Sequence, residues 1–233
     1  MTWIKICGTT NLEDALTAVD AGADAVGFVF YEKSPRNISV EGAKEIVEKL
    51  PEVVEKVGVF VGEMPEKVRE ILKEASLSLA QIYPDFETPL SIPSDRFLET
   101  LQSRVIVALS ASQLKHQKSG DPDVLMGFRV SHGFRDRIAA VLVDSGAADR
   151  PGGTGKKFDW HCAAPITNLM NRIGLKFIVA GGLTPAIVED AMRALRPWGV
   201  DVVSGVEASP GKKDPDKVRA FVKAVRDFDR KSS

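Results

Sequence analysis

Short runs of apolar, β-branched residues recur about every 20–40 residues along this chain, and each is followed by a segment of helical length. This alternation is typical of βα units that build a parallel sheet. Eight such runs are predicted as strands: Trp3–Cys7, Ala25–Phe30, Lys56–Val61, Leu79–Tyr83, Arg104–Ser110, Ala139–Asp144, Lys176–Ala180 and Gly199–Ser204.

The segments between these runs carry the start signals of amphipathic helices. Asn11 and Ser39 are N-cap residue types, and apolar positions at helical spacing follow each of them. Pro65 suits the first turn of the third helix, Thr184-Pro185 opens the seventh, and Pro215 sits early in the last. The fourth and fifth helices have less regular spacing and are placed at Asp95–Gln102 and within Asp123–Arg137.

Eight βα units without a break in composition predict an α/β protein in which residues 1–233 form a single (β/α)8 TIM barrel domain. An open, doubly wound sheet is the competing architecture. Such a sheet usually has a dinucleotide-type glycine fingerprint after its first strand, and this chain has none there.

Composition narrows the function classes. The 31 basic and 32 acidic side chains leave a formal net charge of −1, which predicts neither nucleic-acid binding nor attachment to a membrane surface. Two cysteines and three widely spaced histidines form neither a disulfide scaffold nor a metal-ligand pattern. There is no apolar leader and no apolar run near the ~18 residues of a membrane span. We expect a soluble cytoplasmic protein without a metal site.

Chemistry in such a barrel is done where the strands end. Cys7 ends the first strand, Gln81 lies on the fourth and Asp144 ends the sixth. By position alone, Cys7 is better explained as a small buried hydrophobe. Asp144 suits a general acid, because partial desolvation raises a carboxyl pKa, and it suits a residue that orients the next loop.

Glycines follow the seventh and eighth strands, at Gly181-Gly182 and Ser204-Gly205. Backbone N–H groups beside glycines can approach an anion closely, and a short helix after the eighth strand would add its positive end. This pattern is typical of phosphate sites in barrels, although the glycines could simply form tight turns. A further loop contains Gly153 and Gly155, and we interpret it as a mobile flap over the substrate.

Arg36 lies in the polar loop after the second strand. Arginine can bind a carboxylate through two parallel hydrogen bonds. For this residue alone, an exposed arginine on a loop is the simpler interpretation.

The candidate residues lie in short segments whose sequences and order along the chain are specific when taken together. These segments are Lys5-Ile6-Cys7-Gly8, Gly22–Phe30, Ser34-Pro35-Arg36, Val57–Val61, Gly152–Lys156, Phe158-Asp159-Trp160, Ala180–Leu183, Ser204–Glu207 and Gly211–Asp214. From end to end the chain closely resembles the phosphoribosylanthranilate isomerase family. The resemblance implies a barrel of tryptophan biosynthesis. Its reaction is the Amadori rearrangement of N-(5-phosphoribosyl)anthranilate to 1-(2-carboxyphenylamino)-1-deoxyribulose 5-phosphate, without a cofactor.

The resemblance also implies roles for residues named above. Asp144 would protonate the ribose ring oxygen as general acid, Cys7 would remove the C2 proton as general base, and Arg36 would hold the anthranilate carboxylate. The phosphate would lie against the glycine sites, namely Gly153, Gly155, Gly181, Gly182, Ser204 and Gly205.

Two further residues are expected at the substrate site, Gln81 and Lys5. Strand alternation places Lys5 on the same side as Cys7, and we expect its charge to favour the Cys7 thiolate.

The chain departs from the family at Gln81-Ile82-Tyr83-Pro84, where relatives usually carry Gln-Leu-His-Gly, and the segment Gln113–Arg135 is unlike the family. Two other functions stay open. One is a related phosphosugar isomerase of histidine biosynthesis, which would have an aspartate in place of Cys7. The other is a catalytically silent barrel that binds phosphorylated ligands or a partner protein. We expect a phosphorylated small-molecule substrate and a monomer or homodimer.

Overall fold

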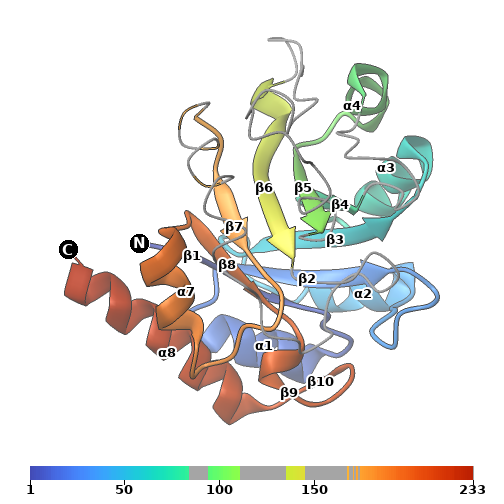
Figure 1. The fold of residues 1–233 in the computed structure, drawn as a ribbon. Coiled ribbons are helices and arrows are strands. Elements are labelled where there is room, and N and C mark those ends of the chain that lie inside the picture. Colours follow the sequence, from blue (N-terminus) through green and yellow to red (C-terminus); the bar gives the residue numbers. More distant parts are fainter. Residues whose placement is uncertain are drawn as a thin grey trace.

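The computed structural model describes residues 1–83, 94–110, 135–144 and 174–232, together with Thr167, Met170 and Arg172. Within them, parallel strands and helices alternate, and the strands close into a barrel (Figure 1). The predicted α/β barrel is confirmed. Its strands are β1 (Trp3–Cys7), β2 (Ala25–Phe30), β3 (Glu55–Val61), β4 (Leu79–Tyr83), β5 (Val105–Ser110), β6 (Ile138–Asp144), β7 (Phe177–Val179) and β8 (Gly199–Val202).

Closure depends on the pairing of the first strand with the last. β1 and β8 run parallel, and the register sets Trp3 opposite Gly199 and Lys5 opposite Asp201. Each other strand pairs with its neighbour in sequence. The carboxyl ends of all eight strands therefore meet at one end of the barrel, although they lie far apart along the chain.

The two last strands are shorter than predicted. β7 stops at Val179, before Gly181 turns the backbone into the left-handed region at φ +83°. β8 stops at Val202, and Ser204 already belongs to a single 3-10 turn, η3 (Ser204–Val206). The short helix expected after the eighth strand is therefore only this turn.

The described helices are α1 (Leu12–Asp20), α2 (Val40–Val47), α3 (Pro65–Glu74), α4 (Asp95–Leu101), α7 (Val188–Leu195) and α8 (Pro215–Ser232). The predicted caps are present: the Asn11 side chain accepts a hydrogen bond from the N–H of Asp14, and the Ser39 side chain accepts one from Gly42. Pro65 is the first residue of α3.

The structure differs from the prediction at two helices. α7 begins at Val188 rather than at Thr184-Pro185, because the Thr184 carbonyl accepts hydrogen bonds from both Ile187 and Val188 and so closes a separate turn first. Most of the predicted fifth helix lies outside the described residues. Its last part forms a 3-10 turn, η1 (Arg135–Arg137), which leads directly into β6.

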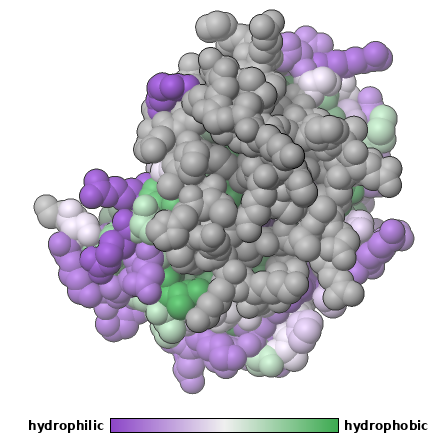
Figure 2. Space-filling view, viewed as in Figure 1, coloured by the Kyte–Doolittle hydropathy of each residue, from purple (hydrophilic) through white to green (hydrophobic). Residues whose placement is uncertain are grey.

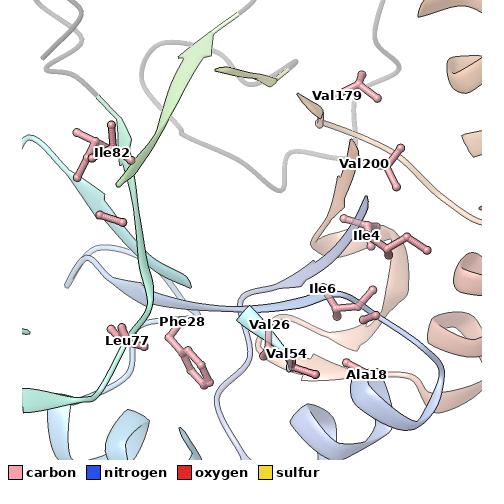
Figure 3. Packing of buried hydrophobic residues seen from close by; sticks show 14 of the residues in the cluster. Ile4, Ile6, Ala18, Val26, Phe28, Val54, Leu77, Ile82, Val179 and Val200 are labelled. Atoms are coloured by element: carbon pink, nitrogen blue, oxygen red, sulfur yellow. The ribbon is translucent and has the colours of Figure 1, made fainter. Parts of the chain in front are cut away.

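Strand alternation separates the core into two layers. Outward-facing residues such as Ile4, Ile6 and Phe28 pack between the sheet and the helices, as Figure 3 shows for part of this cluster. Inward-facing residues such as Leu79 and Leu142 fill the barrel itself. Burial of each large aliphatic side chain contributes about 1.5–3 kcal/mol.

The described residues around the edge of the view in Figure 2 are mostly hydrophilic. Of the helices in the described ranges, none has the length and apolar character needed to cross a membrane.

A small hairpin follows β8 and leads into α8. It consists of β9 (Glu207–Ser209) and β10 (Lys212–Lys213), joined through Gly211 at φ +83°. A Cβ at Gly211 would lie 3.1 Å from the carbonyl oxygen of Pro35, so the hairpin packs closely against the loop after β2. This contact places Glu207 and Lys213 next to Arg36.

Candidate active site

Strand ends bring four polar side chains together at the carboxyl-terminal end of the barrel. Cys7, Gln81, Asp144 and Asp201 come from β1, β4, β6 and β8, and none is more than 4% exposed. Cys7, Gln81 and Asp144 had been predicted there from their positions on strands. Asp201 had not.

Lys5 lies inside the barrel, two residues before Cys7. Its Nζ donates hydrogen bonds to Asp201 Oδ1 and to Gln81 Oε1, each at 2.8 Å. Burial would lower the pKa of Lys5, but the Asp201 carboxylate and Cys7 together outweigh this, and the pKa lies above its usual value. Lys5 is therefore a buried ammonium with a fixed partner. Opposite charges at inward positions of the first and last strands were the sequence signal for this pair.

Cys7 occupies a space that a glycine leaves open. A Cβ at Gly27 of β2 would lie 2.6 Å from Cys7 Sγ and 3.0 Å from Lys5 Cε. Burial raises the pKa of the Cys7 thiol; the Lys5 ammonium opposes this, and the Asp201 carboxylate adds to it. Lys5 therefore favours the thiolate, as expected, but burial outweighs its effect and the net pKa of Cys7 is raised.

Tyr83 connects this group to Asp144. Gln81 Nε2 donates to Tyr83 Oη at 3.3 Å, and the Tyr83 hydroxyl donates to Asp144 Oδ2 at 3.2 Å. Burial and the nearby Asp144 carboxylate raise the pKa of Tyr83 well above its usual value. The residue at which the chain departs from the family that it resembles therefore lies within the site.

Arg36 makes the predicted pair of parallel hydrogen bonds, but its partner is a carboxylate of this chain. Its Nε and Nη2 donate to Glu207 Oε1 and Oε2 at 2.8 and 2.7 Å. Gly8 leaves the room for this arrangement, since a Cβ there would lie 2.6 Å from Arg36 Cδ. Glu207 was not predicted as a site residue, because no spacing rule connects the loop after β2 with the hairpin after β8.

Lys213 joins the same cluster from β10. Its Nζ donates to the carbonyl oxygen of Cys7 at 2.6 Å and to Glu207 Oε1 at 3.2 Å. Burial lowers the pKa of Lys213, and Glu207 offsets only part of this. Burial would raise the pKa of Glu207, but hydrogen bonds from Arg36 and the charge of Lys213 hold it below its usual value. Glu207 is therefore an anion between two cations, and Lys213 also fixes the end of β1.

Glycine is required after β7 and after β8 for different structural reasons. Gly181 and Gly182 adopt φ values of +83° and +65°, which side chains rarely tolerate. A Cβ at Gly205 would lie 1.8 Å from the carbonyl oxygen of Leu183, so the two loops touch backbone to backbone. Gly153 and Gly155 lie outside the described residues.

Two adjoining cavities open at this end of the barrel. One is lined by residues that include Cys7, Arg36, Gln81 and Tyr83. The other is lined by residues that include Asp144, Gly181, Gly182, Ser204 and Gly205. Asp201 and Val203 line both, so the two cavities share a wall.

A larger cavity of about 320 Å³ lies at the opposite, amino-terminal end, beside Trp3 and Trp198. It contains none of the predicted site residues. The chemistry of the described residues therefore belongs to the carboxyl-terminal end. In the part of the chain that the structure describes, no three histidine, cysteine or carboxylate side chains are grouped to hold a metal ion.

Comparison with known proteins gives one consistent family. Residues 4–224 match the family model for N-(5'-phosphoribosyl)anthranilate isomerase. The enzyme of that name from Trichlorobacter lovleyi is 42% identical over 224 residues, which cover 96% of this chain and 98% of the relative.

Solved structures that resemble this chain belong to the same family. The phosphoribosyl anthranilate isomerase from Thermotoga maritima superposes with a TM-score of 0.77 at 36% identity, covering 97% of this chain and all (100%) of the other. A structure of such an enzyme in complex with reduced 1-(o-carboxyphenylamino)-1-deoxyribulose 5-phosphate gives a TM-score of 0.74 at 35% identity, with the same coverage of both chains, 97% and 100%.

Proposed function

The chain belongs to the N-(5'-phosphoribosyl)anthranilate isomerase family of tryptophan biosynthesis, and from this premise we propose how its residues divide the work of the isomerisation. Asp144 is the general acid and Cys7 is the general base. Arg36 binds the anthranilate carboxylate, and the glycine loops after β7 and β8 bind the phosphate.

The observation that carries this proposal is the pair of adjoining cavities. Arg36 and Cys7 line one of them, and Asp144 with Gly181, Gly182 and Gly205 lines the other. A substrate with a carboxylate at one end and a phosphate at the other fits across the shared wall at Asp201. Its ribose then lies between the thiol and the carboxyl group.

The first step opens the sugar ring. Asp144 gives its proton to the ring oxygen while the bond between that oxygen and C1 breaks, and the anilino nitrogen supplies the electron pair that forms the C1–N double bond. Asp144 is buried at the end of an apolar strand and lines the second cavity, where it can reach the ring oxygen.

The second step moves the double bond. The Cys7 thiolate takes the proton from C2, the C1–N double bond accepts the released electron pair, and an enolamine forms that tautomerises to the ketone. Each proton transfer of this kind contributes about 10²–10⁴-fold to the rate. The Lys5 ammonium opposes the effect of burial on Cys7 and so favours the thiolate that this step requires.

Arg36 can bind the substrate while it stays bound to Glu207. A guanidinium has five N–H groups, and Glu207 takes the Nε–H and one of those on Nη2. The remaining donors can meet a planar carboxylate, and Glu207 holds the guanidinium in a fixed orientation for it. Backbone N–H groups of the glycine loops are suited to the phosphate in the other cavity.

The test is turnover of phosphoribosylanthranilate, made in situ, by the purified protein and by Cys7→Ala and Asp144→Ala. We expect turnover by the wild type and losses of about 10²–10⁴-fold in each variant. Asp216→Ala, which removes a carboxylate that is 96% exposed on α8, is the matched control and keeps full activity. Wild-type activity in either of the first two variants would overturn these assignments. Growth of a tryptophan-requiring strain that lacks this isomerase tests substrate and turnover together.

A further inference from the structure

Tyr83 stands between the buried ion pair of Lys5 with Asp201 and the carboxyl group of Asp144. It is the last residue of β4, and the alternation of that strand turns Leu79, Gln81 and Tyr83 into the barrel. Its ring packs in the interior cluster, and its hydroxyl lies 3.3 Å from Gln81 Nε2 and 3.2 Å from Asp144 Oδ2.

The hydrogen bonds along this row have one direction. The Lys5 ammonium can only donate hydrogen bonds, so Gln81 accepts the bond from Lys5 through its carbonyl oxygen, Oε1. The amide N–H groups of Gln81 are then left as donors. One of them donates to Tyr83 Oη, and the Tyr83 hydroxyl donates onward to Asp144 Oδ2. Hydrogen bonds in such a row strengthen one another, because each donor is polarised by the bond it receives.

Tyr83 keeps the proton that this row requires. Among the described residues, Asp144, Asp201 and Cys7 each disfavour a phenolate at Tyr83. Burial acts in the same direction, so the pKa of Tyr83 lies well above its usual value. The hydroxyl is therefore a permanent donor toward Asp144.

We propose that Tyr83 is a positioning residue for the general acid: its hydroxyl holds Asp144 Oδ2 and leaves the transferable proton on Oδ1. This inference rests on the proposed role of Asp144. A donor at Oδ2 disfavours a proton on that oxygen. As Asp144 gives up its proton it becomes a carboxylate, and a hydrogen bond to an ionised acceptor is about twice as strong as one between neutral groups. Tyr83 thus stabilises the transition state more than the bound substrate.

Tyr83→Phe is the direct test, because it removes the hydroxyl and keeps the ring. We expect kcat to fall about tenfold, which is part of the 10²–10⁴-fold that a general acid supplies. KM and the Kd for the reduced product analogue, reduced 1-(o-carboxyphenylamino)-1-deoxyribulose 5-phosphate, should stay within about twofold, because Tyr83 holds the acid rather than the substrate. Binding of the analogue also reports that the variant is folded.

A second arm asks whether the effect passes through Asp144. In an Asp144→Asn background, Tyr83→Phe should change the residual kcat by less than about twofold, since the two residues act as a unit. An equal loss in both backgrounds, or a wild-type kcat in Tyr83→Phe, would overturn the inference.

The role of Asp144 and the role of Tyr83 are distinguished by these variants. Wild-type kcat in Asp144→Asn would remove the proposed acid and this inference with it. A disabled Asp144→Asn together with a fully active Tyr83→Phe would leave the proposed function standing and remove only the role of Tyr83.

Discussion

Lys5 of β1 and Asp201 of β8 form a 2.8 Å ion pair inside the barrel, with side-chain exposures of 0% and 3%. The pair spans the seam at which the barrel closes. It also sets the electrostatic environment of Cys7, since the two charges act on the thiol in opposite directions.

Loss of one partner should destabilise the fold strongly. We expect Lys5→Met to lower the free energy of unfolding by about 3–5 kcal/mol in urea, because it leaves Asp201 as an unpaired buried charge. The double variant Lys5→Met/Asp201→Leu should recover at least half of that loss, since an apolar pair can replace a buried ion pair. Lys67→Met is the control: it breaks an exposed pair with Glu70 at 3.8 Å and should cost about 1 kcal/mol or less. A Lys5→Met loss no larger than that of Lys67→Met would contradict this prediction.

The Cys7 thiol should ionise at a higher pH than an ordinary thiol. Its pKa is raised in the folded protein, so less thiolate is present at each pH than in a free cysteine. Ultraviolet thiolate absorbance can follow this titration in a Cys162→Ser background, where Cys7 is the single cysteine of the chain. Subtraction of the Cys162→Ser/Cys7→Ser spectrum isolates the signal. We expect a midpoint above the reference of about 8.5, and a midpoint at or below that value would contradict the structure.

Arg36→Met should separate binding from chemistry. Removal of a charge-assisted contact worth about 1.5–3 kcal/mol should raise KM roughly 10- to 150-fold, with a much smaller change in kcat. Arg69→Met, on the exposed face of α3, removes the same charge far from the two cavities and should leave KM unchanged. If both variants behave alike, Arg36 has no special part in binding.

Gly205→Ala should be costly although the backbone conformation at residue 205 does not itself require glycine. The added Cβ would meet the Leu183 carbonyl oxygen at 1.8 Å, and the loops after β7 and β8 must separate to relieve this. We expect a loss of about 3 kcal/mol or more in unfolding free energy, at the upper end of overpacking costs. Weaker inhibition by inorganic phosphate should accompany it.

Gly62→Ala provides the comparison for that variant. Gly62 has φ +60° and no atom near the position of an added Cβ, so only backbone strain of about 1–2 kcal/mol should appear. Similar losses in the two variants would mean that the loop contact at Gly205 has no energetic weight.

Much of the fold could be predicted from the sequence because burial on both faces gives each strand a continuous apolar run. The predicted ends of helices and strands were wrong where a turn begins inside an apolar pattern, as at Thr184 before α7 and at Ser204 after β8. The predictions for Gly153, Gly155 and the segment Gln113–Arg135 fall mainly outside the described residues.

Some residues of the site could be predicted from the sequence and others could not, for a physical reason. Cys7, Gln81 and Asp144 could be predicted because topology alone sends strand ends to one place. Glu207 and Lys213 could not, since each is defined by a partner at the far end of the chain: Arg36 lies 171 residues from Glu207, and Cys7 lies 206 residues from Lys213. Local spacing carries no information about such contacts.

The seam between β1 and β8 also has a consequence for biosynthesis. Lys5 leaves the ribosome 196 residues before its partner Asp201, which corresponds to about 10–40 s of translation at usual rates. During that interval β1 has no closing strand, and the ammonium of Lys5 cannot be buried at low cost. The nascent chain therefore reaches a complete reaction centre only at the end of synthesis, when the last strand arrives and the first can finally be enclosed.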